Sequence, residues 1–117
     1  LRCDIDISKE NSEMFYRLYT GNDGQSHMEE YNPPDILPAA SVVFRRHEPG
    51  NFIDWHIAPR RQFIVTLEGQ VEIGLGDGSI WTLGPGDMML AEDITGQGHT
   101  TRAVGTIPRV SIAIPLD

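Results

Sequence analysis

The sequence predicts an all-β protein with a single domain. From residue 41 onward, apolar and β-branched runs of about five to seven residues alternate with tight-turn signals. No stretch of about ten residues or more repeats with the period of a helix. The chain has 117 residues, which is the size of one compact domain. Short strands at regular spacing are typical of a two-sheet sandwich or a closed barrel.

The first part of the chain is predicted to form an arm. Two short strands at 14–19 and 26–31 flank the turn residues 21–24, a pattern that indicates a β-hairpin. The prolines within 33–38 impose an extended connector, because proline fixes its own φ and restricts the residue before it. We therefore expect residues 1–41 to be a short N-terminal arm that covers the mouth of a barrel or packs on a partner subunit.

Residues 42–117 are predicted to be the barrel itself. Asp77-Gly78 is its sharpest hairpin signal, because a type I′ turn needs positive φ at both central residues. Apolar and polar residues alternate over 70–75, so we expect one face of that strand to be buried and the other to face water. The predicted strands of the barrel are 42–47, 52–58, 62–67, 70–75, 79–83, 88–92, 99–104 and 109–115.

The strand predicted at 62–67 is apolar on both faces, since it contains Phe63, Ile64 and Val65 in sequence. One face can pack against an opposite sheet, but the other then needs a second covering layer. In so small a protein the simplest covering layer is another copy of the chain. We therefore predict a homodimer.

The charge of the chain argues against nucleic acid as a partner. Asp and Glu number 17 against 9 Lys and Arg, which gives a net charge of −8, and Lys9 is the only lysine. A phosphate backbone is bound by clustered basic side chains, which this sequence lacks. No apolar run of about 18 residues occurs, so we expect no membrane partner either. Cys3 is the only cysteine, which excludes an internal disulfide, fits a reducing compartment and predicts a cytoplasmic protein.

One spacing pattern carries a family resemblance. Gly50, His56, Ala58, Gln62 and Gly69 stand at the intervals of the first motif of the cupin superfamily, where the residues are Gly, His, His, Glu and Gly. The resemblance implies a cupin-type jelly-roll β-barrel with a functional cavity inside it.

A second segment extends the resemblance. Residues 83–90, which contain a Gly-Pro-Gly-Asp turn followed by apolar residues, resemble the approach to the second cupin motif, and His99 corresponds to its histidine. The two motifs together cover about residues 50–104. In cupins that bind metal, two histidines and a glutamate of the first motif and the histidine of the second hold iron, manganese, nickel, zinc or copper.

The residues also predict a cluster without the family name. Two residues separated by one lie on the same face of a strand, so His56 and Ala58 are expected to point into the barrel, with Gln62 on the next strand completing the cluster. Ala58 has no donor atom, and Gln62 offers a neutral amide in place of a carboxylate. Of the metal ligands that the cupin resemblance implies, His56, Gln62 and His99 thus remain, and they would hold at most one weakly bound Zn, Fe, Ni or Mn ion.

Several other polar residues remain candidates. A fourth ligand could come from His47, His27 or Asp54, although His47, at a hairpin end, and His27, beside acids, are more often ordinary surface residues. Arg60 is expected on the same side as Gln62 by strand alternation, where its guanidinium would bind a carboxylate, phenolate or enolate of a substrate. The alternative for this arginine is an ion pair on the outside of the barrel.

Two functions of different class follow. The first is an enzyme acting on a small organic carbonyl or acid substrate by isomerisation, cyclisation, dehydration or dioxygenation, with His56 and His99 as ligands or acid–base groups and with Arg60 and Gln62 binding substrate. The alternative is a non-catalytic ligand-binding or regulatory cupin with a degenerate metal site. No organic cofactor is expected, and the absence of a Gly-x-Ser-x-Gly elbow makes a nucleophilic hydrolase improbable. The substrate is not predicted.

Overall fold

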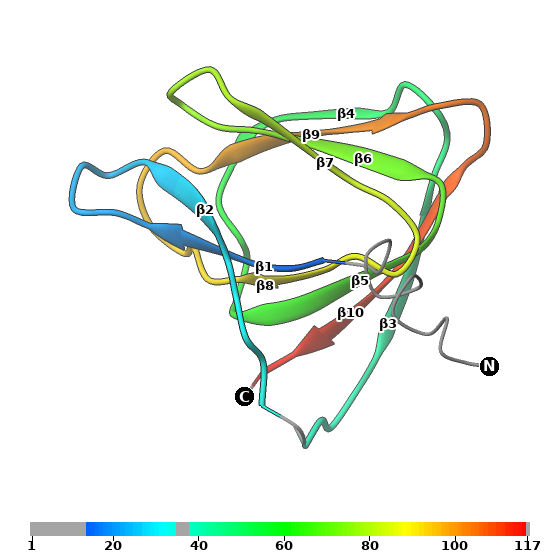
Figure 1. The fold of residues 1–117 in the computed structure, drawn as a ribbon, viewed down its shortest axis with the longest axis horizontal. Coiled ribbons are helices and arrows are strands. Elements are labelled where there is room, and N and C mark those ends of the chain that lie inside the picture. The colour runs from blue at the N-terminus through cyan, green and yellow to red at the C-terminus, as the bar shows by residue number, and fades with distance from the viewer. Residues whose placement is uncertain (1–13, 35–37, 117) are drawn as a thin grey trace, which may run out of the picture.

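The structure is a computed structural model that describes residues 14–34 and 38–116. Regular secondary structure in these residues consists of strands alone, which confirms the all-β prediction (Figure 1). The predicted strand ends agree with the observed ones to within about two residues. The strands are β1 (Phe15–Thr20), β2 (Ser26–Glu30), β3 (Val43–His47), β4 (Phe52–His56), β5 (Gln62–Glu68), β6 (Gln70–Gly74), β7 (Ile80–Leu83), β8 (Met88–Ala91), β9 (His99–Val104) and β10 (Arg109–Pro115).

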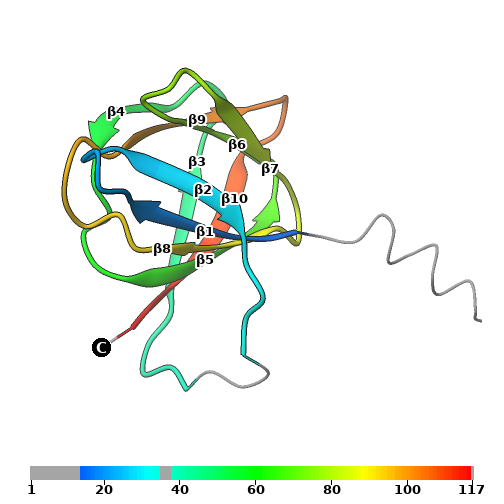
Figure 2. The same ribbon diagram turned by 60° about the vertical axis from the view of Figure 1, so that its left-hand side comes forward.

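The strands form two sheets that face each other (Figures 1 and 2). The larger sheet has the order β2-β1-β8-β5-β10-β3, and the smaller has the order β4-β9-β6-β7. Successive strands such as β3 and β4, or β9 and β10, lie in different sheets, so the chain crosses repeatedly between the two layers. This alternation is what encloses a space between the sheets. Among the described residues, no helix is long and apolar enough to cross a membrane.

The N-terminal hairpin belongs to the larger sheet. β1 pairs with β2 in antiparallel fashion and with β8 in parallel fashion, and the fully buried Leu18 of β1 is part of the hydrophobic core between the sheets. The predicted arm therefore contributes core as well as an edge to the barrel. Residues 1–13 of the predicted arm lie outside the described residues.

Alternation decides which side chains enter the space between the sheets. In β6, Val71 and Ile73 are buried in the core, as the sequence pattern predicts for a strand with one wet face. In β10 the buried residues are Arg109, Ser111 and Ala113, whereas the isoleucines and valine between them are only half-buried. The inner face of β10 therefore brings polar groups into the interior.

The outer face of β5 is covered in part by the chain itself. The ring of Phe63 packs edge-on against Phe15 of β1, with 5.3 Å between the ring centroids. A hollow of about 310 Å³ on the same face is lined by Phe63, Pro33, Pro34 and Ala39 among others. The proline-rich connector thus supplies part of the second layer expected for this strand, and the homodimer stays a prediction.

Candidate functional site

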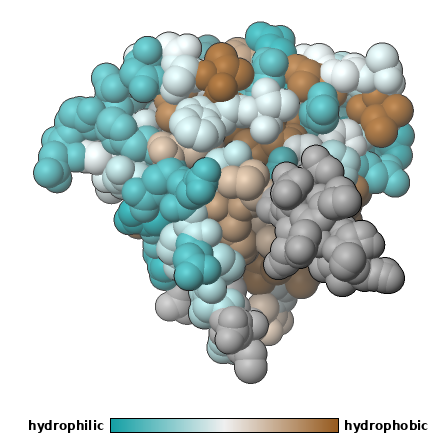
Figure 3. Space-filling view, in the orientation of Figure 1, coloured by the Kyte–Doolittle hydropathy of each residue, from teal (hydrophilic) through white to brown (hydrophobic). Residues whose placement is uncertain are grey.

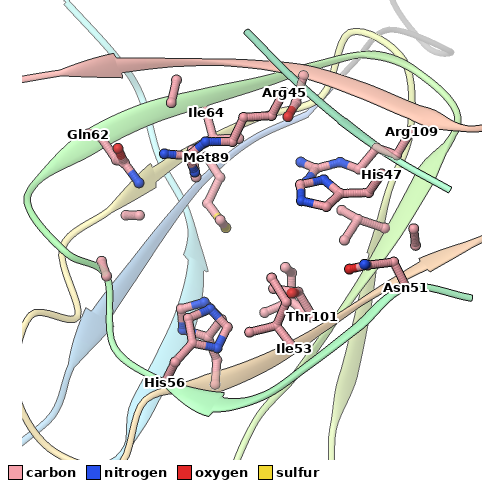
Figure 4. A pocket seen from close by; sticks show the side chains of 18 of the residues that line it. Arg45, His47, Asn51, Ile53, His56, Gln62, Ile64, Met89, Thr101 and Arg109 are labelled. Atoms are coloured by element: carbon pink, nitrogen blue, oxygen red, sulfur yellow. The ribbon is translucent and has the colours of Figure 1, made fainter. Parts of the chain in front are cut away.

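A cavity of about 270 Å³ lies between the two sheets. Its walls come from β3, β4, β5, β6, β8, β9 and β10, and most of the wall area is apolar (Figure 4). Enclosed apolar cavities with a few convergent polar groups are the usual form of a small-molecule site.

The structure brings three of the predicted site residues together. His56 at the end of β4, Gln62 at the start of β5 and His99 at the start of β9 all line the cavity, as does Ala58. We refer to His56, Gln62 and His99 as the histidine end of the cavity. The His56 and His99 rings lie 4.4 Å apart between centroids. Their chemical roles remain predictions.

A β-bulge turns His56 inward. Ile53 pairs with Thr101 and His56 pairs with His99, so three steps along β4 match two steps along β9. The extra residue resets the alternation, and Ile53 and His56 therefore both face the cavity although they are an odd number of positions apart. Bulges of this kind often re-aim a side chain beside a functional site.

Gly98 allows the segment before β9 to approach β4 closely. Its φ is +82°, and a Cβ atom built on it would lie 1.9 Å from the backbone oxygen of His56. Only glycine has both the conformational freedom and the missing side chain that this contact requires. The contact holds the two histidine-bearing strands in register.

The ring orientation of His56 is fixed by its own strand. Its Nδ1 atom lies 2.7 Å from the backbone oxygen of Asp54. Because a carbonyl oxygen only accepts hydrogen bonds, Nδ1 is the donor and carries a proton. A neutral His56 ring therefore presents Nε2 as a hydrogen-bond acceptor.

His99 is held by a buried carboxylate. Its Nδ1 atom lies 2.5 Å from Oδ2 of Asp93, and the Ser26 hydroxyl donates to the same oxygen, also at 2.5 Å. Asp93 has no exposed surface, and its Oδ1 atom has no hydrogen-bond partner among the described residues. Sequence reasoning missed this chain of contacts, because Asp93 lies in the irregular segment between β8 and β9 and Ser26 comes from the distant hairpin.

The side chains at the histidine end provide only part of the donor set that a resident metal ion needs. His56 and His99 each have Nδ1 bonded to an oxygen, which is how metal-binding histidines are usually oriented. The third donor is the neutral Gln62 amide, and the nearby carboxylate of Asp93 is already bonded to His99. Within residues 14–34 and 38–116, no group of three His, Cys, Asp or Glu side chains is placed to hold an ion. The residues therefore do not fit a strong three-ligand centre.

The position expected for Arg60 needs correction. Strand β5 begins at Gln62, so Arg60 lies in the bend before the strand and strand alternation does not reach it. Arg60 is exposed and does not line the cavity. An ion pair on the outside of the barrel is formed by the neighbouring residue Arg61, with 2.8 Å between its Nε atom and Oε2 of Glu92.

Two further candidates also lie away from the cavity wall. His27 on β2 contacts Asp23 through its Nε2 atom at 3.0 Å, and Asp54 is exposed in the bulge of β4. Neither residue lines the cavity. A fourth ligand from these residues is not supported.

The opposite wall of the cavity is basic; sequence reasoning considered His47 as a candidate but missed Arg45 and Arg109. Arg45 and His47 of β3 and Arg109 of β10 all line the cavity, and His47 and Arg109 are direct cross-strand partners. We refer to these three residues as the arginine end. Figure 4 shows Arg109 and His47 close together on the side of Asn51, across the cavity from His56 and Gln62.

Electrostatics at the arginine end are unfavourable for positive charge. Burial and then the charge of Arg45 lower the pKa of Arg109 to about 10. Burial and then the charges of Arg109 and Arg45 lower the pKa of His47 below its usual value. The charged groups that lower these two pKa values, Arg45 and Arg109, are both positive. No negative charge among the causes of these shifts offsets them.

Comparison with solved structures places the fold. A Klebsiella pneumoniae protein with a double-stranded β-helix domain aligns at 26% identity and a TM-score of 0.51, over 62% of this chain and 63% of that one. A cupin domain from Bordetella pertussis aligns at 15% identity and a TM-score of 0.51, over 91% and 95% of the two chains. A cupin 2 conserved barrel domain protein from Leptotrichia buccalis aligns at 16% identity and a TM-score of 0.51, over 69% of this chain and 38% of that one.

The two facing sheets and these likenesses define a double-stranded β-helix. The chain therefore has the fold of these cupin domains, which confirms the fold that the resemblance in the sequence implies. This chain spans less than two thirds of the Klebsiella and Leptotrichia proteins. No protein-family model and no curated protein sequence matches it.

Proposed function

We propose that the protein is a small-molecule-binding cupin whose ligand occupies the cavity between the sheets. The observation that carries this proposal is the convergence of His56, Gln62 and His99, from three separate strands, on one cavity whose wall is mostly apolar. The two histidines accept hydrogen bonds through Nε2, and the Gln62 amide both donates and accepts. This end of the cavity therefore suits a hydroxyl or carbonyl group on a small organic ligand.

The binding proposal is tested with a cavity-filling variant. Ala113 lines the cavity and is 2% exposed, whereas its neighbour Ile112 points to the other face of β10. Ala113→Leu should abolish saturation-transfer NMR signals from small neutral and anionic compounds, because the added atoms occupy the cavity. Ile112→Leu is the matched control and should leave those signals unchanged. Binding that survives Ala113→Leu in a folded protein would place the ligand elsewhere.

A second candidate function, an acid–base enzyme, rests on the Asp93–His99 contact. In this proposal Nε2 of His99 removes a proton from a substrate C–H or O–H group, and the buried Asp93 carboxylate stabilises the imidazolium that forms. The same nitrogen returns the proton to another substrate atom, so protons balance over the cycle. Such a step serves isomerisation, cyclisation or dehydration of a carbonyl or acid substrate.

Metal content separates the acid–base enzyme from a metalloenzyme. Protein purified without a histidine tag should contain less than about a tenth of a metal ion per chain, because the histidine end offers only two imidazoles and one neutral amide. The content should not change in His56→Ala or after addition of iron, zinc, nickel or manganese. Stoichiometric metal that is lost in His56→Ala would establish the metal site that the cupin resemblance implies.

We also propose a homodimer that forms through the outer face of β3 and β10. Phe44 on β3 is 72% exposed, and its cross-strand partner Ile112 is one of several apolar residues on the outer face of β10. β3 is also an edge strand, so its free edge can pair with a second copy while its apolar outer face is covered. Figure 3 shows further hydrophobic residues exposed along the smaller sheet and a hydrophilic surface over the β1–β2 hairpin.

Light scattering after size exclusion tests the dimer. The wild type should elute at twice the chain mass at micromolar concentration, and Phe44→Glu should elute as a monomer. Glu29→Lys on the polar hairpin is the control and should remain dimeric. A wild-type monomer would refute the proposal. A cytoplasmic location also stays a prediction.

A further inference from the structure

The arginine end gathers positive charge inside an acidic protein. The chain has a net charge of −8, yet Arg45, His47 and Arg109 line one wall of the cavity. Arg45 and His47 are two positions apart on β3 and so share its inner face, and Arg109 faces them from the neighbouring strand. Within 14–34 and 38–116, no acidic residue lines the cavity.

The Arg109 guanidinium is buried with donors to spare. Its residue is 9% exposed, and Nη2 donates to the Thr66 hydroxyl at 3.1 Å. The buried Nε atom has no hydrogen-bond partner, and within the described ranges no carboxylate forms an ion pair with Arg109. By contrast, Arg17, Arg46 and Arg61 all pair with glutamates. A buried cation without an anion is costly, so this one is poised for a partner that the described residues do not supply.

Much of the lining between the two ends of the cavity is apolar. Ile53, Ile64 and Met89 lie between the arginine end and the histidine end in Figure 4. In the same view Arg45 extends along the cavity toward the side of Gln62. A ligand that fills this space must therefore combine an anionic head with a short apolar body.

We propose that the arginine end binds the carboxylate of a small organic acid, whose apolar body lies along the cavity and whose far end presents a hydroxyl or carbonyl group to His56 and His99. The planar guanidinium of Arg109 offers the forked donors that match a carboxylate, and Arg45 adds a second cation from the cavity mouth. This inference rests on the proposed function and adds the class of ligand. It replaces the anion-binding role that the sequence suggested for Arg60.

Matched pairs of compounds test the inference at neutral pH. Benzoate and hexanoate are titrated against benzamide and hexanamide, which have nearly the same shape without the charge, and against sulfate and phosphate. We expect the carboxylates to bind at least roughly tenfold more tightly than their amides, because hydrogen bonds between charged groups are the stronger ones. In the wild type, NMR should show that a bound carboxylate raises the pKa of His47 and that a bound amide does not.

Three variants locate the carboxylate. Arg109→Gln should weaken benzoate binding by about tenfold or more while benzamide binding stays the same. Because Arg109 is buried and this variant could fail to fold, Arg45→Gln provides a second test at an exposed position and should weaken benzoate binding severalfold. Arg46→Gln is the matched control: it is the next residue on β3, points away from the cavity and pairs with Glu48. It should leave benzoate affinity within about twofold of the wild type.

The outcomes separate this inference from the proposed function. If amides bind as well as acids and Arg45→Gln has no effect, the carboxylate assignment is overturned while the small-molecule cavity stands. If sulfate or phosphate binds as tightly as the carboxylates, the arginine end is an inorganic anion site and the organic acid is wrong. If no compound of either type binds to the folded wild type, the inference and the proposed function both fail.

Discussion

The two ends of the cavity solve the problem of buried polarity in opposite ways. At the histidine end, each ring nitrogen Nδ1 is bonded to an oxygen of the protein, and the Asp93 carboxylate joins His99 to Ser26. At the arginine end, the buried Nε atom of Arg109 has no partner among the described residues, and the charged neighbour that lowers its pKa, Arg45, is also positive. The first arrangement stabilises the fold and fixes geometry, whereas the second leaves charge available for a ligand.

The largest effect should come from the glycine that brings the histidines together. Gly98→Ala should lower the free energy of unfolding by about 3 kcal/mol or more, because the new Cβ would clash with the His56 backbone at a φ that disfavours side chains. Gly78→Ala is the control, since Gly78 also has positive φ but nothing lies within 4 Å of its built Cβ. It should cost only about 1 kcal/mol. Equal losses in urea unfolding would show that the close approach is not required.

Removal of the buried carboxylate should have the next largest effect. Asp93→Ala leaves the His99 Nδ1–H group and the Ser26 hydroxyl without their partner in a buried site, and should cost about 2–3 kcal/mol. The exposed Asp77→Ala should cost less than about 1 kcal/mol in the same urea titration. A loss no larger than that of Asp77→Ala would mean that the Asp93 network does not stabilise the histidine end.

Removal of the buried cation should act in the opposite direction. Arg109→Met should raise the free energy of unfolding of the ligand-free protein by about 1 kcal/mol, because an apolar side chain of similar length replaces an unpaired buried charge. Arg17→Met should instead destabilise the protein by up to about 1 kcal/mol, since Arg17 is ion-paired with Glu92 and Glu29. If Arg109→Met clearly destabilises the protein, the charge of Arg109 must have a stabilising partner that the described residues do not show.

The smallest effect is a pH dependence at His47. Its pKa is lowered in the folded state by burial and by Arg109 and Arg45, so below about pH 6.5 the unfolded chain binds more protons than the folded one. Stability should therefore fall as the pH drops through this window, by on the order of a few tenths of a kcal/mol because His47 is partly exposed to solvent. The difference between wild type and His47→Gln, followed from pH 7.5 to 5.5, measures it. If the wild type instead becomes more stable than His47→Gln on acidification, the pKa of His47 is raised on folding and the prediction is wrong.

Sequence reasoning predicted the strands well because turn chemistry and apolar runs are local signals. The glycines of the first motif, Gly50 and Gly69, both adopt positive φ in the bends between strands, a conformation that glycine tolerates. The spacing of His56, Gln62 and His99 also predicted that they meet in one cavity. These three positions could be predicted because the interval pattern of a family reflects which residues lie close together in the fold.

The arginine end was hidden because alternation defines two faces of a strand without saying which one faces inward. In β10 the apolar Val110, Ile112 and Ile114 look like the core face, yet the structure buries Arg109 and its neighbours on the other face. Local hydrophobicity alone would therefore indicate the wrong face of β10. Only the pairing of β10 between β3 and β5 decides the orientation.

What the amino-acid sequence determined by itself is the set of strands, their turns and the meeting of the two motif histidines, because each depends on residues near one another or on a fixed interval. What the tertiary structure alone decided is the inward direction of each strand, the bulge that turns His56, and the contact of Asp93 with His99. These depend on which strands become neighbours and in what register. The free energy of packing over the whole molecule determines the strand neighbours and their register, so no local sequence pattern predicts them.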